Sequence, residues 1–514
     1  MPAKIHGRSL THHARHLWRA LSHSAFLVGL GSLLWLVFRT GTKPSRAAYP
    51  CQRAAAASAS AWLVAYVAPL AAAAGLRARL RPRWRWALVG TLVLAVAFAA
   101  TWTASRFLGN SPREPLPVSA LVPLTLSDQR ATDGPASDLF VVSGATGDAC
   151  GVQELIQLMG RKGLPFYQSA EAGETQGPAG LIGEDDVVLI KINCQWNERG
   201  GTNTDLLRSL IQAILAHPDG FQGEVVVADN GQDQYGPFGE GGSFSYTANN
   251  AEDHTQSVQK VVDSFTGAGR VSTYLWDTIT GKKVGEYDAA DMTDGYVVFE
   301  AKSPTTGAFV AYPKFQTGFW TYVSFKNGVW DPATGTYGRD RLKVVNVPVL
   351  KSHGLYGVTA SVKAYMGVTS DRLTIVAGAR AHSTIATGGL ATEMVETRLP
   401  TLNLLDAIWV NAIRLRGPST SYQEATRTNV IAASTDPVAL DAWAARHILI
   451  PTGKAIGYPK TITMAPDAQD PAQAQFANYL RPSMEELLRG GYAVTSDEAR
   501  MNVYVSDLGA TSQP

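Results

Sequence analysis

Apolar segments that alternate with amphipathic ones constrain the fold of this chain more than any other sequence feature. The clearest is DVVLIKI over 186–192, whose near-continuous apolar character is typical of a strand buried on both faces of a parallel sheet. The segment over 204–215 places leucine and isoleucine on one helical face and begins with threonine, a favourable helix cap. Strands alternating with helices in this way favour an α/β fold. We therefore predict a mostly parallel sheet flanked by helices over residues 138–514.

Two stretches depart from this rhythm. Residues 232–340 are rich in Gly, Thr, Tyr and Phe and contain short alternating pieces, which predicts a β-rich insertion. Residues 108–137 are rich in Pro and Ser without periodicity, which is typical of a linker.

The N-terminal region has a composition of its own. All 43 acidic residues follow position 113, whereas 15 of the 45 basic residues lie within the first 113 residues, which leaves the remainder with a net charge of −13. Uncharged apolar runs occupy 24–38, 54–76 and 86–104. Because about 20 apolar residues span a bilayer, we predict that residues 1–107 form a membrane anchor of three transmembrane helices. A signal peptide is the alternative for the first run.

Charge also bears on location and partners. Basic residues are slightly more frequent in the N-terminus and in the loop between the second and third runs than elsewhere in this region. This bias predicts a multi-pass protein of the cell membrane whose large domain lies outside the cytoplasm, on the periplasmic side. The acidic balance of that domain argues against nucleic acid as a partner, whereas a membrane protein partner stays open.

Polar residues follow four of the predicted strands. In an open α/β sheet the ligand crevice lies at the carboxyl ends of the strands, so parallel neighbours would bring these residues to one edge. They are Lys191 and Asn193 after the first strand, Asp229 after the second, Lys351, Ser352 and His353 after the third, and Ser434, Thr435 and Asp436 after the fourth.

The lysines point to an anionic ligand. Lys191 and Lys351 end long apolar runs, where an unpartnered charge is costly. Thr359 and Lys363 are four residues apart at a predicted helix start, so they share a face near a helix N-terminus that favours anions. Snorkelling lysines are the alternative. Asp436 could simply cap the helix that begins at Pro437, with Asp441 near its start.

Two histidines flank the lysine-bearing helix. His353 and His382 could form an acid–base pair, or they could bind a divalent metal together with a carboxylate such as Asp229 or Asp436. From residue 138 onward the sequence has no closely spaced pair of histidines of the kind that binds metals, and it has no phosphate-binding loop or nucleophile-elbow motif.

The cysteines limit the cofactors. Three thiols without a Cys-x-x-Cys pair cannot supply the usual four ligands of an iron–sulfur cluster, so none is expected. Cys150 and Cys194 could form a disulfide in an exported domain, or both could be free and partly buried.

Several of these motifs together resemble the domain-of-unknown-function family 362. They are VLIKIN with TNTDLL, VVVADN, VNVPVLKSHG with VKAYMG, a later histidine and ASTDPVALDAWAA, and they span roughly residues 138–460. Cys51 and its neighbours also resemble a membrane-anchored subgroup. Ile192 and Ser352 depart mildly from the family pattern. The resemblance implies as motif positions Lys191, Asn193, Asn203, Lys351, His353, Lys363, Met366, Gly367, His382, Thr435, Asp436 and Asp441.

The family has no settled reaction, so function is a hypothesis. Some members carry iron–sulfur modules, which implies redox chemistry, although this chain has no such module. We expect an enzyme for redox or group transfer on a small anionic substrate, with metal assistance left open. In this hypothesis Lys351, His353, His382 and Asp229 are catalytic, and Lys191, Asn193, Asn203, Thr359, Lys363, Thr435, Asp436 and Asp441 bind the ligand. The alternative is a non-catalytic sensor or binding module linked to a membrane partner.

Overall fold

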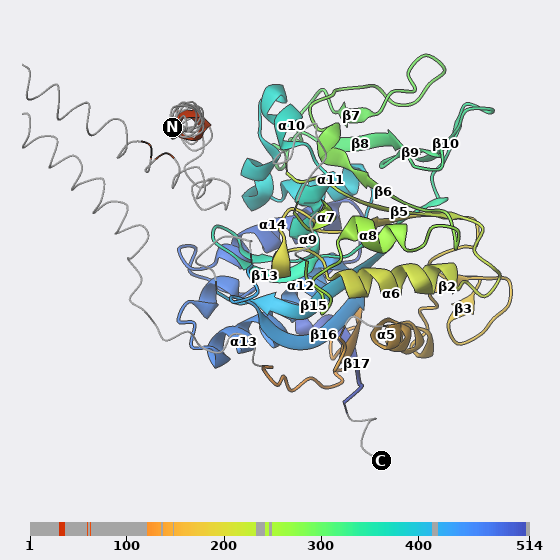
Figure 1. Cartoon of the computed structure of the whole chain (residues 1–514). Helices are drawn as coiled ribbons and strands as arrows, with labels where there is room; N and C mark the ends of the chain where they lie inside the picture. Colours follow the sequence, from red (N-terminus) through yellow and green to blue (C-terminus); the bar gives the residue numbers. More distant parts are fainter. Residues whose placement is uncertain are drawn as a thin grey trace, which may run out of the picture. The chain divides into compact units, whose positions relative to one another are not determined.

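The computed structural model describes residues 30–35, 59, 62, 121–134, 137–146, 149–232, 242–245, 249–413 and 420–509. The chain divides into two units, Met1–Pro115 and Leu116–Pro514. The second unit contains all of the sheets described below, and Figure 1 shows it as layers of helices around a twisted sheet.

The predicted fold class is wrong for the N-terminal region. Among the residues that the structure describes, no helix has the length and apolar character needed to cross a bilayer, so the three transmembrane helices are not supported. The apolar runs over 24–38, 54–76 and 86–104 lie outside the described residues apart from 30–35, 59 and 62. The predicted extracytoplasmic location stays a prediction.

The main sheet is mixed. Its ladder runs β17-β1-β16-β15-β12-β4-β5-β6, while β13 pairs with β15 and with the short β14. Pairing is parallel from β15 through β12, β4 and β5 to β6, but β16 is antiparallel to both β1 and β15. In chain order these strands are β1 (Ser137–Ser143), β4 (Val187–Lys191), β5 (Glu224–Asp229), β6 (Val271–Leu275), β12 (Leu342–Asn346), β13 (Val349–His353), β14 (Gly357–Thr359), β15 (Leu402–Asn411), β16 (Thr426–Ser434) and β17 (Met501–Asp507).

Both faces of this sheet are covered. Val188 and Ile190 of β4 belong to one buried apolar cluster, and Val187 and Leu189 belong to another, as the alternation of side chains along a strand requires. On the first face α5, α6 and α8 pack side by side (Figure 1). Their bounds are α5 (Ala149–Arg161), α6 (Thr204–Leu215) and α8 (Val258–Asp263).

The second face is covered by later helices and by a separate sheet. Apolar side chains from both join the cluster that contains Val187. The helices are α9 (Ser361–Ala364), α10 (Asp371–Ala377), α11 (Gly389–Glu396), α12 (Pro437–Ala444), α13 (Ile450–Ala455) and α14 (Gln475–Arg489), with a short helical turn α7 (Gly242–Ser245) elsewhere. The separate antiparallel sheet has the order β11-β10-β9-β8-β7. Its strands are β7 (Gly295–Val298), β8 (Ala311–Gln316), β9 (Tyr322–Ser324), β10 (Gly328–Asp331) and β11 (Thr336–Gly338).

Two smaller features complete the description. The separate sheet lies within the segment predicted as a β-rich insertion, and β2 (Tyr167–Gln168) pairs with β3 (Gln176–Gly177). Part of the predicted linker lies against the main sheet, because Leu121 forms a bridge with Arg427 and Gln129 forms one with Val503.

Candidate functional site

The ends of β4 and β5 hold a buried ion pair. These strands are adjacent and parallel, with Lys191 paired to Ala228, so the next residue of β5, Asp229, comes close to the lysine. Lys191 Nζ lies 3.0 Å from Asp229 Oδ1 and donates a hydrogen bond of 2.6 Å to the carbonyl of Ala364. The other oxygen of Asp229 accepts from the backbone N–H of Cys194 at 2.9 Å. Burial raises the pKa of Asp229, and the Lys191 ammonium opposes that rise.

Gly367 closes over this ion pair. It ends the short 3₁₀ turn Tyr365–Gly367 that follows α9, and a Cβ at this position would overlap Asp229 Oδ1 and Lys191 Nζ. Asn230 holds this turn against the ion pair. Its backbone N–H donates to the carbonyl of Gly367 at 3.0 Å, and its side chain donates to the carbonyl of Thr369 at 2.8 Å. The glycine is therefore needed for close approach of the backbone to a charged pair.

Lys351 lies in β13 and is 1% exposed. Its amine donates to the carbonyl of Gly200, and Lys351 pairs across the ladder with Thr359 of β14. Burial, together with the neighbouring Lys363, lowers the pKa of Lys351 to about 7. At neutral pH this amine is therefore only partly protonated.

Lys363 lies in α9 and is 4% exposed. Its Nζ lies 5.6 Å from the centre of the Tyr356 ring, and within the described part of the chain it has no hydrogen bond or ion pair. Burial lowers the pKa of Lys363 to about 8; Asp371 opposes this shift and Lys191 adds to it. A buried cation without a hydrogen bond or an ion pair is costly, so Lys363 is the feature of the site that most needs a ligand.

The start of α9 is not the open anion site that the sequence predicts. Asp441 of α12 accepts hydrogen bonds from the backbone N–H groups of Ser361 at 2.7 Å and Val362 at 2.9 Å. The carboxylate thus occupies the helix N-terminus and holds the helix that carries Lys363. Burial raises the pKa of Asp441 to about 7, although these two hydrogen bonds act to lower it.

A narrow pocket opens beside these groups. Together with the open solvent at its mouth it spans about 300 Å³, but its interior leaves room for little more than one water-sized group. The buried oxygens Asn193 Oδ1 and Thr359 Oγ1 have no hydrogen-bond partner among the described residues. Both residues belong to the wall, which is formed by Lys191, Asn193, Gln195, Asp229, Gln232, Thr359, Lys363, Ala364 and Gly367.

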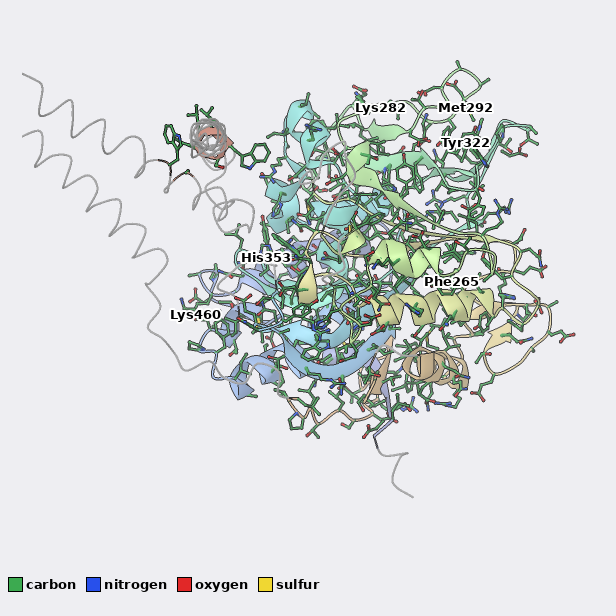
Figure 2. The ribbon with its side chains drawn as sticks, viewed as in Figure 1. Phe265, Lys282, Met292, Tyr322, His353 and Lys460 are labelled. Carbon is green, nitrogen blue, oxygen red and sulfur yellow. The ribbon has the colours of Figure 1, made fainter. Side chains whose placement is uncertain are left out.

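Both candidate histidines flank Tyr356 and do not line the pocket. The His353 ring lies 5.2 Å and the His382 ring 5.8 Å from that of Tyr356. Nδ1 of His353 accepts from the backbone N–H groups of Leu355 and Tyr356, so in the neutral ring Nε2 carries the proton. Figure 2 shows His353 well apart from the labelled residues of the β-rich segment.

His382 is linked to a carboxylate. Its backbone N–H donates to Asp371 Oδ1 at 2.9 Å, and its ring Nδ1 lies 3.9 Å from the other oxygen of Asp371, which also accepts from Arg380. The acid–base role of the two histidines stays a prediction. Among the described residues, no three His, Cys, Asp or Glu side chains gather as a metal-ligand set.

Three other predicted ligand-binding residues lie outside the pocket, and two of them cap helices. Asn203 caps α6, since its Oδ1 accepts from the backbone N–H groups of Asp205 and Leu206. Asp436 caps α12 and also accepts from Ser137 and Thr495, while Thr435 is exposed. None of the three lines the pocket.

The direction of β16 explains why its end does not join the lysines. Because β16 is antiparallel to β15, its last residue, Ser434, pairs with Asn403 near the beginning of β15. Lys351 pairs with Asn411 at the other end of that strand. The structure thus brings together the ends of β4, β5 and β13, but not the end of β16.

Asp406 is a buried charged residue of this region that belongs to none of the sequence motifs described above. It interrupts the apolar run LNLLDAIWVN of β15, which is the signal that could have revealed it. Its carboxyl accepts from the backbone N–H of Asn203 at 2.8 Å and from the side chain of Asn250 at 3.2 Å. Burial raises the pKa of Asp406 to about 7, and its charge acts to raise the pKa of Lys351.

Cys194 is a free, buried thiol, whereas the side chain of Cys150 lies outside the described part of the chain. Burial raises the pKa of Cys194 well above its ordinary value, and the neighbouring Asp229 carboxylate adds to this rise. The thiol is therefore protonated at physiological pH and is not a nucleophile in this state.

Comparison with known proteins adds one finding. Residues 339–446 match the family described as "Domain of unknown function (DUF362)". The matched segment contains Lys351, His353, Thr359 and Lys363 but not the Lys191–Asp229 pair. No curated protein and no solved structure matches the chain. The membrane-anchored subgroup is not confirmed. Residues 339–446 of this chain thus match the DUF362 family, as the sequence motifs predicted.

Proposed function

We propose that the pocket binds the anionic group of a small substrate, with Lys363 as the cation that anchors it. The observation that carries this proposal is the buried ammonium of Lys363, which lines the pocket and has no hydrogen bond or ion pair to any described residue. An anion entering the pocket would neutralise this charge in a low-dielectric environment, where the attraction is strong.

The other two lysines have different parts in this proposal. Lys191 is already neutralised by Asp229, so that pair forms a fixed wall. Lys351 does not line the pocket, but as a neighbour of Lys363 it adds positive potential when it is protonated. The site therefore carries a net positive charge at neutral pH, and a carboxylate or phosphate oxygen is the complementary ligand group.

Two wall oxygens supply specificity. The hydroxyl of Thr359 could donate a hydrogen bond to the anion, and Asn193 Oδ1 could accept one from a hydroxyl group of the ligand. The narrow interior favours entry of one functional group, while the rest of the ligand stays at the mouth. We propose that the chain is an enzyme that acts on a small substrate with a carboxylate or phosphate group.

Thermal unfolding of the full chain tests the proposal. Phosphate, sulfate and propionate are added at matched ionic strength to the natural chain and to the Lys363→Met and Lys460→Met variants. Lys460 is an exposed lysine and serves as the control. At least one anion should raise the Tm of the natural chain and of the control. Because a charge-assisted hydrogen bond contributes about 1.5–3 kcal/mol, Lys363→Met should bind roughly 10–100-fold more weakly. Equal Tm shifts in all three proteins would contradict the proposal.

A further inference from the structure

The three buried lysines differ in what occupies their amines. The amine of Lys191 is held by Asp229 and by the carbonyl of Ala364. The amine of Lys351 donates to the carbonyl of Gly200, and Lys351 does not line the pocket. Of these three, only Lys363 both lines the pocket and has an amine without a hydrogen bond or ion pair to the described residues. Its nitrogen is therefore the one that an incoming ligand can reach.

The surroundings of Lys363 favour a reactive amine. A lysine becomes a nucleophile when it loses its proton, and burial beside another cation promotes that loss. Lys191, which forms an ion pair with Asp229, is the second cation beside Lys363. The pKa of Lys363, lowered to about 8, leaves a useful fraction of neutral amine near neutral pH.

We propose that Lys363 forms an imine with the carbonyl carbon of a small oxo acid bound in this pocket. This inference rests on the proposed function, because the carboxylate of the oxo acid is the anion that the site attracts. It deepens that function by naming the substrate class and the bond that forms. Because the interior admits about one functional group, the carbonyl group enters to reach Lys363 while the rest of the oxo acid stays at the mouth.

The step is balanced without any further reactant. The amine nitrogen of Lys363 attacks the carbonyl carbon, and a nitrogen–carbon bond forms as the π bond to oxygen breaks. The two amine protons leave with the oxygen as water, and the imine takes one proton from solvent to become an iminium ion. The carboxylate of the substrate neutralises that new positive charge. Thr359 Oγ1, buried in the wall without a partner among the described residues, could hydrogen-bond to the oxygen before it leaves.

Reductive trapping of the full chain tests the inference. Pyruvate is the probe, cyanoborohydride reduces the imine to a stable secondary amine, and peptide mass spectrometry locates the adduct. We expect about one adduct per chain, located on Lys363, with propionate suppressing its formation in the natural protein. Lys363→Arg keeps the positive charge but cannot form the imine, so it should lose the adduct. Lys460→Arg, at an exposed position, should keep it.

The outcomes separate this inference from the proposed function. If propionate raises the Tm but pyruvate gives no adduct on Lys363, the imine is excluded and the anion site stands. Adducts spread over exposed lysines and unchanged in Lys363→Arg would also overturn the imine. If propionate neither raises the Tm nor suppresses labelling, and no adduct forms on Lys363, both proposals fail.

Discussion

Gly367 shows how a single residue shapes the site. The turn that it ends lies directly on the Lys191–Asp229 pair, and Asn230 holds it there through the carbonyl of Gly367. Any side chain at this position would separate the two charges or displace the turn. A buried ion pair that loses its geometry leaves charges that neither water nor a partner compensates.

We therefore expect Gly367→Ala to destabilise the chain by about 3 kcal/mol or more, the range found when a buried ion pair is broken. Gly177→Ala is the control, because a Cβ at Gly177 would meet no atom within 4 Å. The measurement is the free energy of unfolding in urea. Equal losses in the two variants would mean that overlap with the ion pair is not the cause.

The individual site residues were partly predictable. A lysine that ends an apolar run cannot be buried without a partner, which identified Lys191, Lys351 and Lys363 as unusual. The same reasoning applied to Asp406 would have found it, since it interrupts an apolar strand. Which carboxylate pairs with which lysine could not be predicted, because the pairing depends on strand order and not on local pattern.

At the level of elements, α9 depends on a carboxylate from α12. Asp441 accepts the hydrogen bonds of the first two N–H groups of this short helix, so it positions Lys363 above Tyr356. A helix of this length is marginal alone and needs such support. The sequence indicated that Asp441 lies near the start of its own helix, α12. Its carboxyl group instead accepts hydrogen bonds from the first N–H groups of α9.

Asp441→Ala should therefore weaken anion binding and reduce stability by about 1–2 kcal/mol, the usual effect of losing a cap. The pKa of Asp441 is raised to about 7, so its neutral form is favoured in the folded chain, and its contribution to stability is lost as pH rises through that value. The loss on substitution should thus be larger at pH 5 than at pH 8, as measured by urea unfolding.

Asn203→Ala is the matched control for this prediction. Asn203 caps α6 through two comparable hydrogen bonds but has no titrating group. Asn203→Ala should lower the free energy of unfolding by a similar amount at pH 5 and at pH 8. If Asp441→Ala also lowered the free energy of unfolding equally at both pH values, the conclusion that the Asp441 cap is protonated would be wrong.

Strand direction marks the limit of prediction at this scale. The apolar run of β16 predicts a buried strand, but it does not indicate whether the strand is parallel or antiparallel to its neighbours. Long-range pairing with β1 and β15 decides its direction, and this pairing moves Asp436 away from the lysines. The ends of β4, β5 and β13, which pair in parallel with their neighbours in the sheet, do meet.

For the whole molecule, buried titratable groups of both signs determine how stability depends on pH. Burial raises the pKa values of Asp406 and Asp441 to about 7 and that of Glu393 to about 8. Their contribution is present at low pH and is lost as pH rises through these values. Burial lowers the pKa values of Lys351 and Lys363 to about 7 and about 8. Their contribution is present above the unfolded value of about 10.4 and is lost as pH falls through the folded values.

The ligand-free chain should therefore be least stable near pH 7–8, and the two lysines should restore stability as the pH rises toward about 10.4. In the Lys351→Met, Lys363→Met double variant the recovery above about pH 8 should be absent. The measurement is the urea midpoint as a function of pH for both proteins. An identical recovery in the double variant would show that other groups cause it.

The architecture of the large unit was predictable in outline only. Apolar runs alternating with an amphipathic helix indicated an α/β sheet, and the structure has one. The mixed strand directions could not be read from local composition. The prediction of three transmembrane helices rested on hydropathy alone, and the described residues do not support it.

The most direct test of the central claim is the proton uptake that accompanies anion binding. Calorimetric titration of the full chain with phosphate and with propionate, at pH 8 in two buffers of different ionisation enthalpy, measures it. A bound anion favours the charged form of Lys363, so the natural chain should take up a fraction of a proton on binding. In Lys363→Met this uptake should fall and the affinity should drop. Binding with the same affinity and the same proton uptake in both proteins would contradict the account.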